Sequence, residues 1–237
     1  MKKILIIFMF LFLLTGCGKN NNELVMVTEA GFAPYEYYED GKIVGVDIDI
    51  AEEIAKKMGK KLVIKDVAFD SIINEVKSSK SDFGAAGISY SEEREKEVDF
   101  SINYTTSKQV VVIKKDSGIT IDNLDGKKIA VQLGSIGDGY VTSNYKNSEI
   151  VRQKKYLQAI EDLKSDKVDC VVMDELPALE FVKVNDNLMV LDKELTSDSY
   201  GMIVKKGNTE LLNTINEVLN ELKDNGKIDE FIINHTK

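Results

Sequence analysis

The chain of 237 residues has no tryptophan, one histidine, two prolines and two cysteines. His235 lies near the C-terminus, and one histidine argues against a histidine-based catalytic triad or a metal site with several histidine ligands. Two cysteines are too few for the disulfide framework that staples many small secreted domains. We therefore expect neither a metal nor any other cofactor.

Positive charge is also scarce. Asp and Glu number 40 against 31 Lys and Arg, which gives a formal net charge of −9 at pH 7. Binding to phosphates needs clustered Lys and Arg, so we expect no nucleic-acid partner and no polybasic membrane-binding face. Apolar and charged residues occur in globular proportion, which excludes a disordered or fibrous chain.

The one long apolar run lies at the N-terminus. Residues 4–14 follow Lys2 and Lys3, and as a helix they would span about 16 Å, short of a bilayer core of about 30 Å. We interpret residues 1–16 as a signal peptide. Residues 14–17, Leu-Thr-Gly-Cys, resemble a bacterial lipobox, which implies a diacylated Cys17, a tether over 17–22 and a place on the extracytoplasmic face of the cell membrane. An ordinary signal peptide with a chance cysteine is the alternative.

Strand-like and helix-like runs alternate along the rest of the chain. Ile50, Ile54 and Met58 recur at helical spacing and predict a helix over 47–58, with Asp47 or Asp49 as its N-cap. The pair Asp40-Gly41 predicts a hairpin turn. Other strands are expected over 24–28, 62–67, 83–86, 109–114, 128–131, 150–152, 170–173, 188–191 and 200–204. Other helices are expected over 70–79, 139–145, 156–165, 177–184, 209–224 and 226–234.

This alternation predicts an α/β fold with mostly parallel sheets covered by helices. Two such series, each under about 110 residues, indicate two lobes rather than one large sheet. We expect the first lobe over 23–107 plus 200–237 and the second over 108–199, joined by two short hinge crossings. Ligands of open α/β sheets bind beyond the C-terminal strand ends, so the site should lie in the cleft.

Polar residues follow the strand expected over 83–86. Gly87 offers accessible backbone, Ser89 a hydroxyl and Arg94 a guanidinium. A carboxylate is held well by a bidentate cation with hydroxyl or amide donors. Arg94 is one of only two arginines in a chain rich in lysine, so it is a candidate carboxylate ligand. A surface ion pair with a neighbouring acid is the alternative.

Three further segments carry candidate binding groups. The Gly-rich turn 134–137 leads from a strand into a helix, where backbone N–H groups suit an anion. Asp174 ends the strand expected over 170–173 and could bind an ammonium group or cap the next helix. Glu29 and Phe32 leave the first strand, and Phe32 could cover a ligand side chain with Phe69 opposite. For both rings, a place in the core is the alternative.

These segments, in this order behind a signal peptide, resemble the family 3 extracellular solute-binding proteins, the amino-acid receptors of ABC importers. The strongest match is 45–55, Gly-Val-Asp-Ile-Asp-Ile-Ala-Glu-Glu-Ile-Ala. Further blocks match at 82–94, 98–101, 124–128 and 169–174. The resemblance covers about residues 23 to 235 and implies the two-lobe periplasmic-binding-protein type II fold, called a Venus flytrap.

The resemblance also implies roles for individual residues. Arg94 would bind the α-carboxylate of an amino acid, and Asp174 its α-ammonium group. The groups that assist at the carboxylate would be Ser89 and the backbone of Gly87, Ser135 or Ile136. The positions that contact the ligand side chain would be Glu29, Phe32, Phe69 and Gln132. Ser89 stands where threonine is commoner, and Gln132 is neutral where some members carry lysine.

The implied partners are a small amino acid and the permease and ATPase subunits of an ABC importer, with the receptor itself a monomer and not an enzyme. Glu29 beside aromatic faces favours arginine, lysine or ornithine over glutamine, cystine or another polar amino acid. An acidic ligand is disfavoured, because no lysine or arginine stands at these side-chain positions.

Three other functions remain open at this point. An arogenate or prephenate dehydratase-like enzyme could use the same scaffold, with Glu175 or Glu29 as the catalytic acid. A sensory or channel ligand-binding module could bind the same ligand without importing it. A purely structural lipoprotein would leave the Arg94 and Asp174 motifs unexplained.

Overall fold

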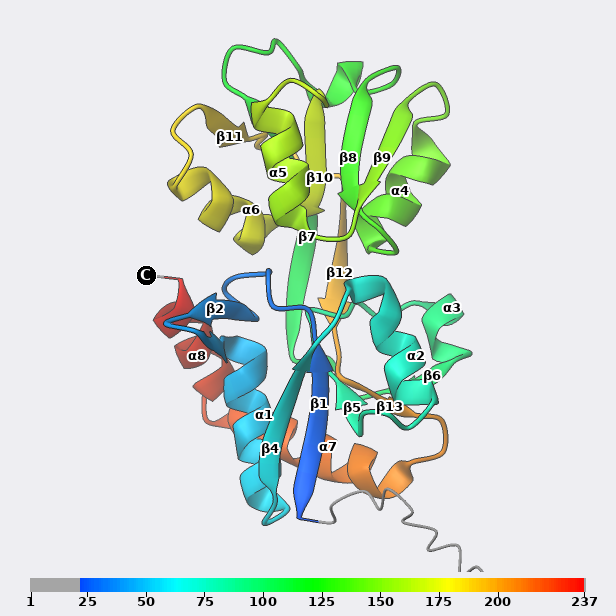
Figure 1. Cartoon of the computed structure of the whole chain (residues 1–237), viewed down its shortest axis with the longest axis vertical. Coiled ribbons are helices and arrows are strands. Elements are labelled where there is room, and N and C mark those ends of the chain that lie inside the picture. Colours follow the sequence, from blue (N-terminus) through cyan, green and yellow to red (C-terminus); the bar gives the residue numbers. More distant parts are fainter. Residues whose placement is uncertain (1–21, 237) are drawn as a thin grey trace, which may run out of the picture.

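The computed structural model describes residues 22–236, and these form two lobes, each built on its own β-sheet (Figure 1). The expected signal peptide, Cys17 and all of the expected tether except Asn22 lie outside the described residues. Within 22–236, no helix combines the length and the apolar character needed to cross a membrane.

Lobe 1 is the part of the chain built on a five-stranded sheet with the order β4-β1-β5-β13-β6. Strand β1 runs parallel to β4 and β5, and β13 runs antiparallel to β5 and β6. Its strands, with the small hairpin β2–β3, are β1 (Glu23–Thr28), β2 (Tyr37–Glu39), β3 (Lys42–Val44), β4 (Lys61–Asp66), β5 (Phe83–Gly84), β6 (Val98–Phe100) and β13 (Ile203–Lys205). Its helices are α1 (Val46–Lys57), η1 (Phe69–Ser71), α2 (Ile72–Lys77), α3 (Glu92–Glu95), α7 (Thr209–Asp224) and α8 (Lys227–His235).

Lobe 2 is the part built on the second sheet, with the order β11-β7-β10-β8-β9. Strands β10, β8 and β9 are parallel, while β7 is antiparallel to β10 and β11. The strands are β7 (Thr105–Lys114), β8 (Lys128–Gln132), β9 (Glu149–Gln153), β10 (Cys170–Asp174) and β11 (Leu188–Val190). The helices are η2 (Ile121–Asn123), α4 (Ile136–Asn144), α5 (Tyr156–Lys164) and α6 (Glu175–Lys183). Both sheets are therefore mixed, and the expected parallel pairing holds for three neighbouring strands in each.

Two strands cross between the lobes side by side (Figure 1). The N-terminal half of β7 pairs antiparallel with β12 (Thr196–Tyr200), from Thr105 opposite Tyr200 to Gln109 opposite Thr196. The sequence predicted strand on this crossing only from 109 and from 200, because residues 105–108 and 196–199 are polar and lack an apolar pattern. These residues form strands because their backbones pair with each other, although their side chains show no strand pattern.

Helix α1 begins with an unexpected cap. The N-cap is Gly45, not Asp47 or Asp49 as the sequence suggested. Asp47 is fully buried and its carboxylate accepts hydrogen bonds from the Gly87 backbone N–H at 3.0 Å and the Tyr104 hydroxyl at 2.6 Å. Two residues distant in the sequence thus bind the carboxylate that the local sequence assigned to the helix end. The Asp47 carboxylate in turn fixes the backbone of Gly87.

The turn before α1 requires glycine. Gly45 has φ 135° and ψ 176°, a region that is essentially restricted to glycine, and a Cβ there would lie 2.2 Å from the Tyr35 carbonyl oxygen. We expect Gly45→Ala to lower the free energy of unfolding by at least about 3 kcal/mol in urea denaturation. Gly41→Ala is the matched control: its φ is also positive but no atom lies within 4 Å, so its loss should stay near about 1 kcal/mol. Equal losses would contradict this account.

Candidate functional site

One pocket between the lobes brings together every binding residue that the sequence predicted. Its lining includes Glu29, Phe32, Phe69, Gly87, Ser89, Arg94, Gln132, Ser135, Ile136 and Asp174. The first six come from lobe 1, and the last four belong to lobe 2. Three further lining residues were not predicted: Glu36, Ala86 and Tyr156.

Arg94 is nearly buried at the pocket wall of lobe 1. Ser91 caps the short helix α3 by accepting from the Arg94 backbone N–H at 3.2 Å, which fixes where this side chain starts. The guanidinium donates to the carbonyl oxygens of Ser89 at 2.6 Å and Gly134 at 2.8 Å, and it lies over the Phe69 ring at 5.5 Å. Desolvation lowers the pKa of Arg94. Within residues 22–236 no carboxylate forms an ion pair with this buried guanidinium, which suits an anionic ligand group.

Asp174 is the N-cap residue of α6 by position, but its side chain makes no cap hydrogen bond. Its carboxylate instead accepts from the hydroxyls of Ser107 at 2.9 Å and Tyr200 at 2.5 Å. Burial, reinforced by the negative charge of Asp198, raises the pKa of Asp174 to about 6. The sequence left capping and ligand binding open for this residue, and the structure shows no side-chain cap.

Asp198 is an acid at this site that the sequence gave no reason to select. It lies on the hinge strand β12 and accepts from the Ser89 hydroxyl at 3.0 Å and the Gln109 side-chain amide at 3.2 Å. Burial raises its pKa. The hydrogen bond from Ser89 to Asp198 thereby links the lobe 1 wall of the pocket to the hinge strand β12.

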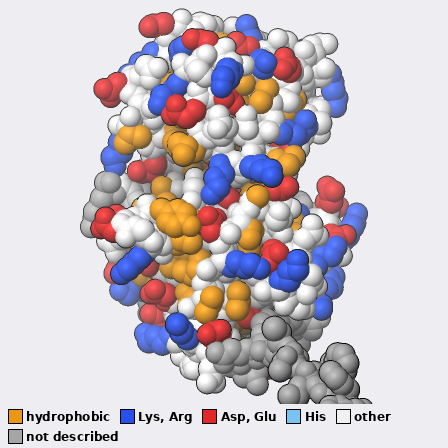
Figure 2. All heavy atoms as spheres, in the orientation of Figure 1, with side chains coloured by type: hydrophobic (Ala, Val, Ile, Leu, Met, Phe, Trp, Pro, Cys, Tyr) orange, Lys and Arg blue, Asp and Glu red, His pale blue; other side chains and the backbone are white. Residues whose placement is uncertain are grey.

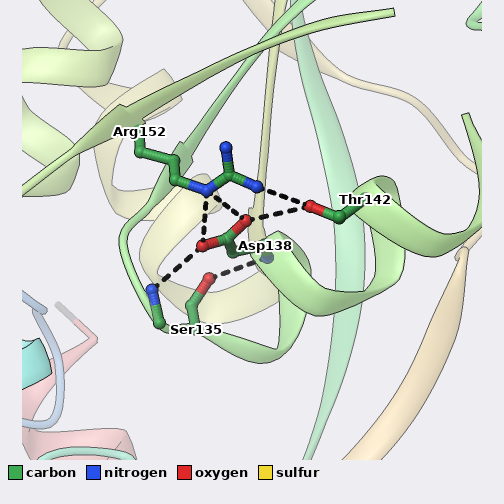
Figure 3. A network of polar contacts seen from close by, with 5 residues as sticks. Ser135, Asp138, Thr142 and Arg152 are labelled. Carbon is green, nitrogen blue, oxygen red and sulfur yellow. Dashed lines mark hydrogen bonds and ion pairs between the residues drawn. The ribbon is translucent and has the colours of Figure 1, made fainter. Parts of the chain in front are cut away.

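The turn that begins α4 is braced by the other arginine of the chain (Figure 3). Ser135 caps the helix by accepting from the Asp138 backbone N–H, and the Asp138 carboxylate accepts from the Gly134 N–H, both at 3.1 Å. Arg152 donates through Nε to both Asp138 oxygens, at 2.9 and 3.1 Å, and through Nη2 to the Thr142 hydroxyl at 2.7 Å. This network fixes the backbone of the turn that lines the pocket from lobe 2.

Glu29 is the buried acid at the other end of the pocket, with 1% of its surface exposed. One carboxylate oxygen accepts from the Gln132 amide at 3.1 Å, and the other forms an ion pair with the Lys155 ammonium at 2.9 Å. Burial raises the pKa of Glu29, and Lys155 counters that shift. Both partners come from lobe 2, so Glu29 connects the two lobes directly.

The two aromatic residues predicted to cover a ligand side chain both line the pocket and have different neighbours. Phe32 stacks on Tyr156, with ring centroids 5.7 Å apart and planes 22° apart, while Phe69 lies against the guanidinium of Arg94. Tyr156 is the first residue of α5, and the sequence gave it no role beyond starting that helix. Gly87 brings its backbone close to this stack, because a Cβ there would lie 2.7 Å from Phe32.

The lining side chains leave almost no free volume in the pocket. Its volume is about 10 Å³, the scale of one water molecule, whereas small-molecule sites commonly measure about 300–1,000 Å³. A larger groove of about 830 Å³ adjoins it at Arg94 and is lined by residues of η1, α2, α3 and α4. Figure 2 shows this side of the surface hollowed between the lobes. A ligand can therefore enter the pocket only if the lobes separate or the lining side chains move.

No group of three or more His, Cys, Asp or Glu residues within 22–236 has a geometry that could hold a metal ion. Glu29 instead accepts from the Gln132 side-chain amide and pairs with the Lys155 ammonium, and Asp174 accepts from two hydroxyl groups. This arrangement can bind charged groups of an organic ligand.

Comparison with known proteins supports this description. The family described as "Bacterial extracellular solute-binding proteins, family 3" matches residues 24–235. The arginine-binding extracellular protein ArtP of Bacillus subtilis is 33% identical over 231 residues, which cover 92% of this chain and 91% of that protein.

Solved structures agree in fold. The amino acid ABC transporter substrate-binding protein AbpA of Streptococcus pneumoniae, bound to L-arginine, has a TM-score of 0.87 at 35% identity and covers 91% of this chain and 94% of its own. An ancestral arginine-binding protein bound to glutamine has a TM-score of 0.84 at 38% identity, covering 90% and 97%. The chain belongs to the family 3 bacterial extracellular solute-binding proteins.

Proposed function

We propose that this chain is the extracytoplasmic receptor of an ABC importer and that its lobes close around a free L-amino acid with a polar, preferentially cationic side chain. The observation that carries the proposal is the placement of Arg94 and Asp174. Both are buried, they come from different lobes, and they line one pocket.

A zwitterionic amino acid suits these two groups. Both of its charges are strongly hydrated, so burial requires a partner of opposite charge at each end. Arg94 would bind the α-carboxylate with the help of Ser89, Gly87 and the α4 turn, and Asp174 would bind the α-ammonium group. The ligand would then bridge the lobes and stabilise the closed form, as in the hinge closure of periplasmic binding proteins.

The remaining lining residues favour a cationic ligand side chain. Among the described residues of the pocket, Arg94 is the cationic one, against three carboxyl groups on Glu29, Glu36 and Asp174. Burial and the neighbouring Asp47 raise the pKa of Glu36, which favours its neutral form and leaves Glu29 as the acid for a side-chain cation. Phe32 and Tyr156 add aromatic faces. Of the proteins similar to this chain, ArtP is an arginine-binding protein and the AbpA structure contains bound L-arginine.

The family and the Leu-Thr-Gly-Cys segment at 14–17 support a wider proposal. We propose that Cys17 is lipidated and anchors the receptor to the outer face of the cell membrane, and that a permease and an ATPase accept its ligand. We further propose lobe boundaries at 23–107 plus 200–237 and 108–199, a monomeric state and no chemical change in the ligand. Glu29, one of the two acids considered for a dehydratase, is engaged by Gln132 and Lys155.

Removing either charge should abolish binding. Losing one partner of a buried charge pair costs about 3–5 kcal/mol, so Arg94→Ala and Asp174→Asn should each weaken amino-acid binding by at least about 100-fold in calorimetry. Asn keeps an oxygen that accepts from Ser107 and Tyr200, so Asp174→Asn should stay folded, as circular dichroism would confirm. Lys96→Ala is the control, because it removes an exposed cation two residues from Arg94 and outside the pocket lining, and it should retain binding. Unchanged affinity in both site variants would refute the assigned roles.

Binding should weaken in acid. The pKa of Asp174 is about 6 because it is buried, and its ionised form is the one that attracts an ammonium group. Affinity should therefore be full above pH 7 and fall by about tenfold for each pH unit below 6, with proton release on binding near pH 6. Calorimetry at pH 7.5 and pH 5, in buffers of different ionisation enthalpy, measures both effects. An affinity that does not change between these pH values would contradict the proposal for Asp174.

The ligand class can be tested by screening the twenty amino acids with ornithine and cystine. A ligand that binds only the folded state raises the unfolding temperature, so thermal shifts rank the candidates and calorimetry gives their affinities. We expect arginine, lysine or ornithine to bind most strongly and to be recovered unchanged. Strongest binding by glutamate or aspartate would contradict the role of Glu29, and turnover of arogenate or prephenate would favour an enzyme.

A further inference from the structure

Lys155 has a place at the site that the predicted roles leave unexplained. It is the N-cap residue of α5 in lobe 2, and its side chain makes no cap hydrogen bond. Its ammonium group instead reaches across to lobe 1, where it lies 2.9 Å from Glu29 and 3.6 Å from Asp66. Lys155 therefore pairs with Glu29, the same carboxylate that the proposed function assigns to the cationic end of a ligand.

The two acids differ in their surroundings. The Glu29 side chain is 2% exposed and lines the pocket, whereas the Asp66 side chain is 23% exposed and lies outside the pocket lining. Asp66 is fixed by the Ala30 backbone N–H at 2.9 Å and the Tyr38 hydroxyl at 3.2 Å. The Lys155 side chain is itself 43% exposed, so it has room to leave Glu29 and remain beside Asp66.

The closed pocket is thus held by contacts that resemble those of a ligand. Glu29 has a cation in Lys155, Arg94 has carbonyl oxygens in Ser89 and Gly134, and Phe32 has a flat partner in Tyr156. Of these, the Lys155 ammonium is the contact that carries the same charge as an arginine or lysine side chain. A buried carboxylate without a cation is costly, and Lys155 removes that cost when no ligand is bound.

We propose that Lys155 is a specificity-determining residue: a tethered ammonium that holds Glu29 until a cationic ligand side chain displaces it towards Asp66. The inference rests on the proposed amino-acid binding function and deepens it. A cationic ligand gains Glu29 but must displace Lys155, whereas a neutral ligand of the same shape leaves the ion pair in place. Lys155 therefore reduces the difference in affinity between cationic and neutral amino acids, so the site can bind both.

The test compares L-arginine with L-citrulline, which has nearly the same shape but a neutral side chain, at pH 8 by calorimetry. In Lys155→Met the tethered competitor is gone and Glu29 lacks a cation. The ratio of the citrulline Kd to the arginine Kd should therefore rise by about tenfold or more over the unmodified protein, as expected for one charge-assisted contact. Lys155→Arg retains a cation at this place and should leave the ratio within about threefold of its original value.

Lys154→Met is the matched control. Lys154 is exposed, and this substitution removes the same charge but leaves the ion pair between Lys155 and Glu29 in place. It should leave the ratio unchanged. A ratio in Lys155→Met that stays the same or falls, while the unmodified protein binds arginine, overturns the role of Lys155 alone. Failure of the unmodified protein to bind any amino acid overturns the proposed function as well, so the two failures can be told apart.

Discussion

A buried guanidinium and a buried carboxylate on opposite walls of one pocket are the constraint on which the rest of this structure depends. Both groups are expensive to remove from water, and neither is compensated by a direct ion pair between Arg94 and Asp174 among the contacts of the described chain. Carbonyl oxygens satisfy the guanidinium, and hydroxyls satisfy the carboxylate. The two groups come from different lobes and line the same pocket.

The hinge explains how such a pocket can admit a ligand. Strands β7 and β12 carry the chain between lobes and also carry polar groups of the site, since Ser107 contacts Asp174 and Asp198 contacts Ser89. A change in the angle between the lobes would separate Arg94 from Gly134 and Glu29 from Gln132, and so would open the pocket. The network around Asp138 and Arg152 lies wholly within lobe 2, so such a movement would not have to break it.

Sequence reasoning found the elements that have their own apolar pattern and the residues that stand in a family motif. It placed α1, α5 and α7 within one or two residues, and all ten predicted binding residues line the pocket. It missed the features that depend on contacts between residues far apart in the sequence. Asp47 is not a helix cap because Gly87 and Tyr104 recruit it, the hinge strands lack an apolar pattern, and no local signal linked Lys155 to Glu29. Tyr156 was hidden because a buried aromatic residue at a helix start is usually part of the core.

The central claim is that the two poles of a free amino acid are bound by residues from the two lobes. A crystal structure of the chain with bound arginine tests this most directly. The account predicts the α-carboxylate within hydrogen-bond distance, about 3 Å, of the Arg94 guanidinium and the α-ammonium group at the same distance from the Asp174 carboxylate. Arginine bound elsewhere, or held in the pocket without touching either residue, would contradict it.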